Sequence, residues 1–133
     1  MPRLYREAPL NSIWEGSGNI NALDVLRVLD KHPESIDAWR AELLPAFIDG
    51  RIARAARELE TELLDHATRE VRARFIVERM ALVWQAALLV QHAPSFVSDA
   101  FIASRVDGAS TQTLGTLPAD TALREIVDRA ALS

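Results

Sequence analysis

The residues best suited to chemistry lie in one short segment near the N-terminus, where Glu15 stands just before a glycine-containing turn. Ser17 is the expected N-cap of the helix that follows, and Asn19 lies in its first turn. The free N–H groups of that turn, together with these two side chains, form a natural cradle for an anion or a diphosphate. Trp14 could shield Glu15 from water, and a desolvated carboxylate is a stronger base.

The same segment also has a purely structural interpretation. A Glu-Gly-Ser sequence before a helix often does no more than cap it, because the serine hydroxyl accepts a hydrogen bond from a free backbone N–H group. The residues alone therefore leave both roles of Glu15 and Ser17 open.

The composition restricts the kind of protein and the kind of site. The chain has 133 residues, 49% hydrophobic and 26% charged, which is typical of one folded domain. Its net charge of −4 argues against a nucleic-acid surface, and the absence of cysteine excludes thiolate metal sites and cysteine nucleophiles. The three histidines lie far apart in the sequence, so we expect no metal site.

The spacing of apolar residues and the placement of proline and glycine predict a single all-α domain over residues 1–133. We expect a bundle of five or six helices, preceded by a flexible lead-in segment at residues 1–15. The predicted helices run from about Gly18 to Lys31, Ser35 to Leu44, Asp49 to Asp65, Ala67 to His92, Phe96 to Arg105, and onward from Pro118.

Two of these helices carry apolar patterns that bear on packing. Residues 80–90, in the second half of the long helix, are apolar on nearly all sides, so we expect other helices or a partner chain to surround them. The same run spans only about half the length that a membrane span needs. The last helix has an apolar stripe made of Leu123, Ile126, Val127 and Ala130.

The N-terminal segment resembles that of a known family. The order Arg-Glu-Ala from Arg6, five further residues, and then Trp-Glu-Gly-Ser-Gly-Asn-Ile from Trp14 looks like the active-site segment of the FAD-dependent acyl-CoA dehydrogenases. The resemblance extends from Arg3 to about Leu29 and is closest to the AidB and isovaleryl-CoA-dehydrogenase-like branch. Residues 114–120 also resemble the tail of such proteins, and the chain between shares only a helical pattern.

The resemblance implies a role for each residue of the motif. Glu15 would be the base that removes the α-proton of an acyl thioester while a hydride passes to the flavin. Gly16 and Ser17 would form the turn against FAD, with the hydroxyl facing the diphosphate. Asn19 would lie near the adenosine part of the cofactor, at a position where the family usually has glutamine.

The resemblance also indicates what this sequence lacks. Arg3 and Glu7 match the last two positions of the family's glycine-rich signature, but the glycine-rich front of that signature is absent. The chain begins about a dozen residues before Glu15 and has no counterpart of the family's central β-domain. We therefore expect a C-terminal fragment that binds FAD only within a full-length parent, and that alone has no cofactor and no activity.

The competing hypothesis is a non-enzymatic helical module for oligomerisation or interaction. In either case we expect a cytoplasmic protein that forms a homo-oligomer or binds a partner carrying the missing domains. Acyl-CoA would be a ligand only in the full-length context, and no membrane contact is expected. A DNA-associating AidB-type C-terminal region is the weakest hypothesis, because residues 51–80 hold seven arginines against six interleaved acids.

Overall fold

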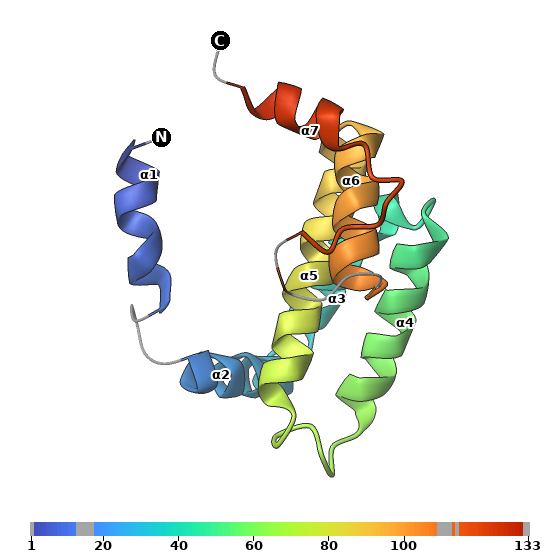
Figure 1. Cartoon of the computed structure of the whole chain (residues 1–133). Helices are drawn as coiled ribbons and strands as arrows, with labels where there is room; N and C mark the ends of the chain where they lie inside the picture. Colours follow the sequence, from blue (N-terminus) through green and yellow to red (C-terminus); the bar gives the residue numbers. More distant parts are fainter. Residues whose placement is uncertain (1, 13–17, 109–112, 114, 132–133) are drawn as a thin grey trace.

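The structure is a computed structural model that describes residues 2–12, 18–108, 113 and 115–131. Within these ranges it contains seven α-helices, three short helical turns and no β-strand, which confirms the all-α prediction (Figure 1). The elements are α1 (Pro2–Glu7), η1 (Ala8–Ser12), α2 (Gly18–Lys31), α3 (Glu34–Leu43), η2 (Leu44–Ala46), α4 (Gly50–Leu64), α5 (Ala73–His92), α6 (Ser95–Phe101), η3 (Ile102–Val106) and α7 (Leu123–Ala130). The count exceeds the expected five or six because the sequence analysis did not predict α1.

Three predicted helices are confirmed within one residue at each end, namely α2, α3 and α4. α2 ends two residues before Pro33, and α3 ends two residues before Pro45. Proline has no backbone N–H group and pushes the residue before it out of the helical region, so both helices stop where the sequence predicts.

The start of α4 is fixed by an aspartate and an arginine. Asp49 is the N-cap, and its side chain accepts a hydrogen bond from the Arg51 backbone N–H at 2.9 Å. The Arg51 guanidinium also pairs with the Asp49 carboxylate at 2.6 Å and with Asp99 of α6 at 2.5 Å. The side-chain hydrogen bonds from Arg51 lower the pKa of Asp49 below its ordinary value of 3.8. One arginine therefore joins the first turn of α4 to α6.

The prediction of a single helix over residues 67–92 is wrong at its start, because α5 begins only at Ala73. The preceding residues form turns. The Thr68 hydroxyl donates to the Asp65 carboxylate at 2.6 Å, and the Arg69 backbone N–H donates to the Asp65 carbonyl at 3.0 Å. Hydrogen bonds of this local kind offer the backbone an alternative to the helical ladder.

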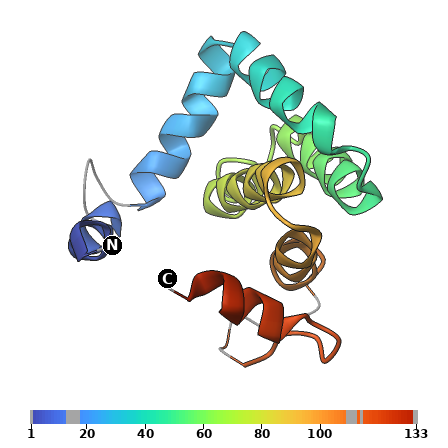
Figure 2. The same cartoon turned by 90° about the horizontal axis from the view of Figure 1, so that it is seen from above.

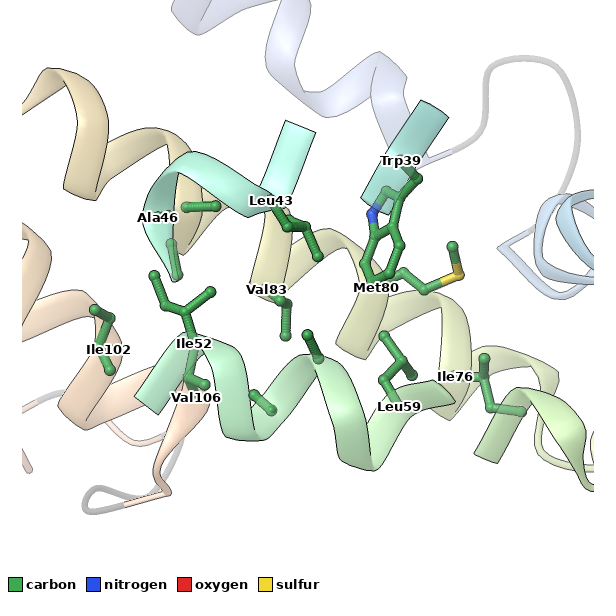
Figure 3. Close-up of a cluster of buried hydrophobic side chains, with 14 of the residues drawn as sticks. Trp39, Leu43, Ala46, Ile52, Leu59, Ile76, Met80, Val83, Ile102 and Val106 are labelled. Carbon is green, nitrogen blue, oxygen red and sulfur yellow. The ribbon is translucent and has the colours of Figure 1, made fainter. Parts of the chain in front are cut away.

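The core is built around α5, which contacts α2, α3, α4, α6 and η3. Seen from above, α5 lies near the middle of these helices (Figure 2). Apolar side chains from successive helices meet in one buried cluster (Figure 3). The largest fully buried members are Leu43, Ile52, Leu59, Ile76, Ile102 and Val83. These helices therefore share one hydrophobic core.

The prediction that other helices or a partner chain surround residues 80–90 is confirmed on one side of α5 only. Met80 and Val83 are buried against the core, but Trp84 and Leu88, one helical turn apart, remain 42% and 39% exposed. Helices of the described chain thus leave one side of α5 uncovered. Cover by a partner chain stays a prediction.

Neither terminal helix, α1 or α7, contains a buried residue among those that the structure describes. α1 lies apart from the other helices in both views (Figure 1 and Figure 2), and its described side chains are all exposed. α7 starts at Leu123 rather than at Pro118, because the Thr121 N–H donates to the Pro118 carbonyl in a turn (3.0 Å). Its apolar stripe is mostly uncovered, since Leu123 and Val127 are 54% and 66% exposed and only Ile126 is partly buried.

The predicted helix from Phe96 to Arg105 is present as α6 followed by η3, which is a π-helical turn. There the Asp107 N–H donates to the Ile102 carbonyl, five residues back, at 2.9 Å. The Ser104 hydroxyl donates to the Ala100 carbonyl at 2.7 Å, and Arg79 of α5 donates to the Val106 carbonyl at 3.1 Å. This wider turn delivers Ile102 and Val106 to the core.

Candidate functional site

The predicted site lies at the N-terminal end of α2. Three of its four residues, Glu15, Gly16 and Ser17, lie outside the described residues. The fourth, Asn19, occupies the first turn of α2, where its side chain is exposed. The structure therefore describes the helix side of the predicted site, and the roles of the other three residues stay predictions.

The first turn of α2 is accessible to a ligand. Gly18, Asn19 and Ile20 are all exposed. The first N–H groups of an α-helix have no partner within the helix, and the helix dipole gives that end a partial positive charge. Because α2 has 14 residues, its dipole is well developed, and this turn can accept an anionic group.

Arg74 at the start of α5 adds a full positive charge beside this turn. A Cβ atom placed on Gly18 would lie 3.9 Å from Nη2 of Arg74, in ordinary van der Waals contact. The Arg74 side chain is exposed and forms no hydrogen bond or ion pair with the described residues. Its guanidinium therefore remains available beside the residue that directly follows Ser17.

Arg74 is not among the site residues predicted from the sequence. It lies more than fifty positions from the motif, within a segment whose interleaved arginines and acids are typical of a solvated helix face. Only the packing of α2 against α5 brings the two helix starts together. The sequence contains no local signal that would have identified it.

Packing and an ion pair hold α2 in this position. Ala22 and Leu26 are buried against the core, on the side of α2 that contacts α5. Near the other end of α2, Asp30 pairs with Arg69 of the turn that precedes α5. The site-bearing end of α2 is thus positioned by contacts along most of the helix.

The described side of the site fits one part of the expected cofactor. Exposed N–H donors and a guanidinium match the diphosphate of FAD, which is an anion. The two described cavities, of about 480 and 470 Å³, are lined by residues other than Gly18, Asn19 and Arg74. Neither of these two cavities adjoins the first turn of α2, so the fit to FAD rests on the match to its diphosphate.

The two cavities were not predicted from the sequence, and their arginines are already paired. Arg51 and Asp99 line the first, together with Phe96 and the segment before α7. Arg69 and its partner Asp30 line the second, between α2 and the turns before α5. Both cavities therefore contain arginines that neighbouring carboxylates neutralise.

The other residues singled out by the sequence have simple surroundings. Arg3 and Glu7 form an exposed ion pair within α1, with Nε and Oε1 separated by 2.9 Å. His32 lies 3.2 Å from the Glu34 carboxylate at the surface. In the part of the chain that the structure describes, no cluster of three potential metal ligands is found, and no helix is long and apolar enough to cross a membrane.

Comparison with known proteins identifies the class. The chain is acyl-CoA dehydrogenase-like, which confirms the resemblance inferred from the motif around Glu15. The relative that shows this is "Putative acyl-CoA dehydrogenase AidB" of Escherichia coli (strain K12), with 39% identity over 112 residues. The match covers 80% of this chain and 20% of AidB, so the chain spans about a fifth of its relative's length. No family model matches the chain, and no solved structure gives a significant match.

Proposed function

We propose that this chain is the C-terminal part of an acyl-CoA dehydrogenase-like flavoprotein, in which it supplies the catalytic base and one side of the FAD site. The observation that carries the proposal is the motif around Glu15, within a chain that is 39% identical to AidB. The exposed first turn of α2 with Arg74 beside it supports the anion-binding half of the site.

The reaction would be the α,β-dehydrogenation of an acyl-CoA. Glu15 would take the α-proton of the acyl thioester as a general base. FAD, when bound, supplies the acceptor for the hydride that leaves the β-carbon, and a double bond forms between the two carbons. Gly16, Ser17 and Asn19 would hold the cofactor at the start of α2, and Arg74 would add charge opposite the diphosphate.

The isolated chain would not catalyse this reaction. No side chain of a protein accepts a hydride, so the base needs a bound flavin and a bound thioester to act on. The first turn of α2 and Arg74 would hold only the diphosphate, and the flavin ring would depend on parts of the flavoprotein beyond the described residues. We therefore propose that the chain purifies without colour and works only with the remaining part of such a flavoprotein. A cytoplasmic location belongs to the same proposal.

A second candidate function is that of a non-enzymatic interaction module. The observation that favours it is the uncovered apolar surface on α5 and α7, which includes Trp84, Leu88 and Val127. Association with DNA has less support. Several arginines of residues 51–80 are paired with carboxylates, as Arg51 is with Asp99 and Arg54 is with Asp107, and such pairs leave little charge for phosphates.

Replacing Glu15 tests the enzymatic proposal. In a chimera where this chain replaces the matching segment of AidB, Glu15→Gln should slow flavin reduction by an acyl-CoA about 10²–10⁴-fold, because an amide cannot accept the proton. The rate is measured as anaerobic bleaching of the flavin absorbance. Glu125→Gln, an exposed carboxylate in α7, serves as the matched control and should leave the rate unchanged.

Two results would contradict the proposal. One is a Glu15→Gln chimera that reduces its flavin at the unmodified rate. The other is a folded chimera that retains no flavin at all. In the first case the capping interpretation of Glu15 would stand, and in the second the interaction module would be the better account.

A further inference from the structure

The second half of α2 has less support from the core than the first half. Ala22 and Leu26 are buried, but after Leu26 no residue of α2 is buried and only Leu29 is partly buried. The cavity of about 470 Å³ lies along this second half, between α2 and the turns that precede α5. Packing against the core therefore holds α2 mainly near its middle.

One ion pair joins this second half of α2 to the rest of the described chain. Nη2 of Arg69 donates to both carboxylate oxygens of Asp30, and both residues line the cavity. The Arg69 side chain is 15% exposed, which is the lowest value among the ion-paired arginines of the described residues. Solvent and salt screen such a pair less than a surface pair, so it restrains the two elements more firmly.

Arg69 is itself held in place, although it lies in a turn and not in a helix. Its backbone N–H donates to the Asp65 carbonyl at 3.0 Å, and the Thr68 hydroxyl donates to the Asp65 carboxylate at 2.6 Å. Asp65 is the C-cap of α4, so these bonds attach the turn to the end of that helix. The pair with Asp30 therefore connects α2 to the joint between α4 and α5.

We propose that Asp30 and Arg69 are positioning residues, whose ion pair sets where the first turn of α2 lies relative to Arg74. Gly18 lies about 18 Å from Asp30 along the helix. A tilt of α2 by about 5° around Leu26 shifts Gly18 by about 1 Å, and displacements of that size matter to ligand binding and chemistry. The inference rests on the proposed function only in that FAD is the ligand whose diphosphate this position serves.

A second carboxylate on the same helix provides a matched control. Asp24 and Asp30 are both 49% exposed and both line the cavity, but Asp24 pairs with Arg27 inside α2. Asp30→Asn keeps the shape of the side chain and removes its charge, and Asp24→Asn does the same four-fifths of a helical turn and one further turn away. Asp30→Glu keeps the carboxylate. The three variants separate the pair between elements from the general effect of losing a charge on α2.

The position of α2 is measured in the full chain, which has no native cysteine. Spin labels at Asn21→Cys in α2 and Gln85→Cys in α5, both exposed positions, report the distance between the two helices by pulsed electron spin resonance. Dilution with unlabelled chain removes distances between copies. Asp30→Asn should broaden the distance distribution or shift its maximum, whereas Asp24→Asn and Asp30→Glu should leave it unchanged. Circular dichroism checks that all variants keep their helices.

Affinity for FAD connects this position to the site. In the chimera with AidB, Asp30→Asn should raise the dissociation constant for FAD about tenfold, although Asp30 touches no part of the site, because a shifted α2 presents its N–H groups less well to the diphosphate. Asp24→Asn should leave the dissociation constant unchanged, and Asp30→Glu should restore most of the affinity.

Three outcomes would overturn the proposal. They are a distance distribution that Asp30→Asn leaves unchanged, an equal change in Asp24→Asn, and an unaltered affinity for FAD in the Asp30→Asn chimera. A chimera that retains no flavin in any form contradicts the proposed function instead. In that case the spin-label distances still decide whether the ion pair positions α2, so the two proposals can fail separately.

Discussion

α4 and α7 are both amphipathic helices, but they differ in how far their apolar faces are buried. α4 buries five residues in the core, whereas α7 buries none. α4 is flanked by α5 and η3, and two arginines in its first turns reach Asp99 and Asp107 across the interface. α7 has α6 as its main neighbour. An apolar stripe therefore predicts which face of a helix packs against a neighbour. It does not predict that the neighbour is another helix of the same chain.

The largest loss of stability in the two helices is expected when a buried side chain of α4 is shortened. Ile52 is fully buried, so Ile52→Ala removes buried methyl groups and leaves a cavity. The free energy of unfolding should fall by about 2–5 kcal/mol. Urea denaturation followed by circular dichroism measures it. A decrease in the free energy of unfolding well below 1 kcal/mol would mean that α4 is no more buried in the core than α7.

A smaller effect is expected at the N-cap of α4. Asp49→Ala removes the cap of the helix and the partner of Arg51, and should lower the free energy of unfolding by about 1 kcal/mol. Asp49→Asn, which can still cap, should cost less and serves as the matched control. Thermal or urea unfolding of the three proteins at neutral pH gives the comparison.

The same aspartate should give a pH signature. Arg51 lowers the pKa of the folded-state Asp49 carboxyl below 3.8, so its contribution to stability is fully present well above that pH. The stability difference between the unmodified chain and Asp49→Asn should therefore shrink as the pH falls below 3.8 and through the lower folded-state value. A difference that stays constant down to pH 2 would show that the carboxylate charge is not what stabilises the start of α4.

The smallest effect is expected in α7. Val127 is 66% exposed, so Val127→Ala should change the free energy of unfolding by no more than about 0.5 kcal/mol. The measurement is made at a concentration where the chain is monomeric. A loss approaching that of Ile52→Ala would show that the α7 stripe is covered after all.

Helix bounds could be predicted closely where the sequence contains strong local signals. α2, α3 and α4 end near prolines or begin at a capping aspartate, so their bounds could be predicted closely. The start of α5 could not, because the Thr68 hydroxyl bonds to Asp65 in a way that apolar spacing does not reveal. α1 was not predicted because it has only six residues, too few for a helical apolar repeat to be recognised.

The candidate site also combines residues that are contiguous in the sequence with one that only packing brings near them. The start of α2, with Asn19 in its first turn, could be predicted because the motif is contiguous in the sequence, while the role of Asn19 stays a prediction. Arg74 could not, because its place beside Gly18 arises from the packing of two helices that are distant in sequence. Long-range proximity of this kind comes from tertiary structure, and a single sequence carries no periodic trace of it.

The π-helical turn at the end of α6 has a consequence for how this chain can change length. Such a turn holds one residue more than an α-helical turn, and the irregularity is confined between Ile102 and Asp107. The Ser104 hydroxyl donates to the Ala100 carbonyl, while Arg79 and Arg54 bind the far end of the turn. The extra residue is thus accommodated within a single turn, so a segment one residue longer than a regular helix still places both Ile102 and Val106 in the core.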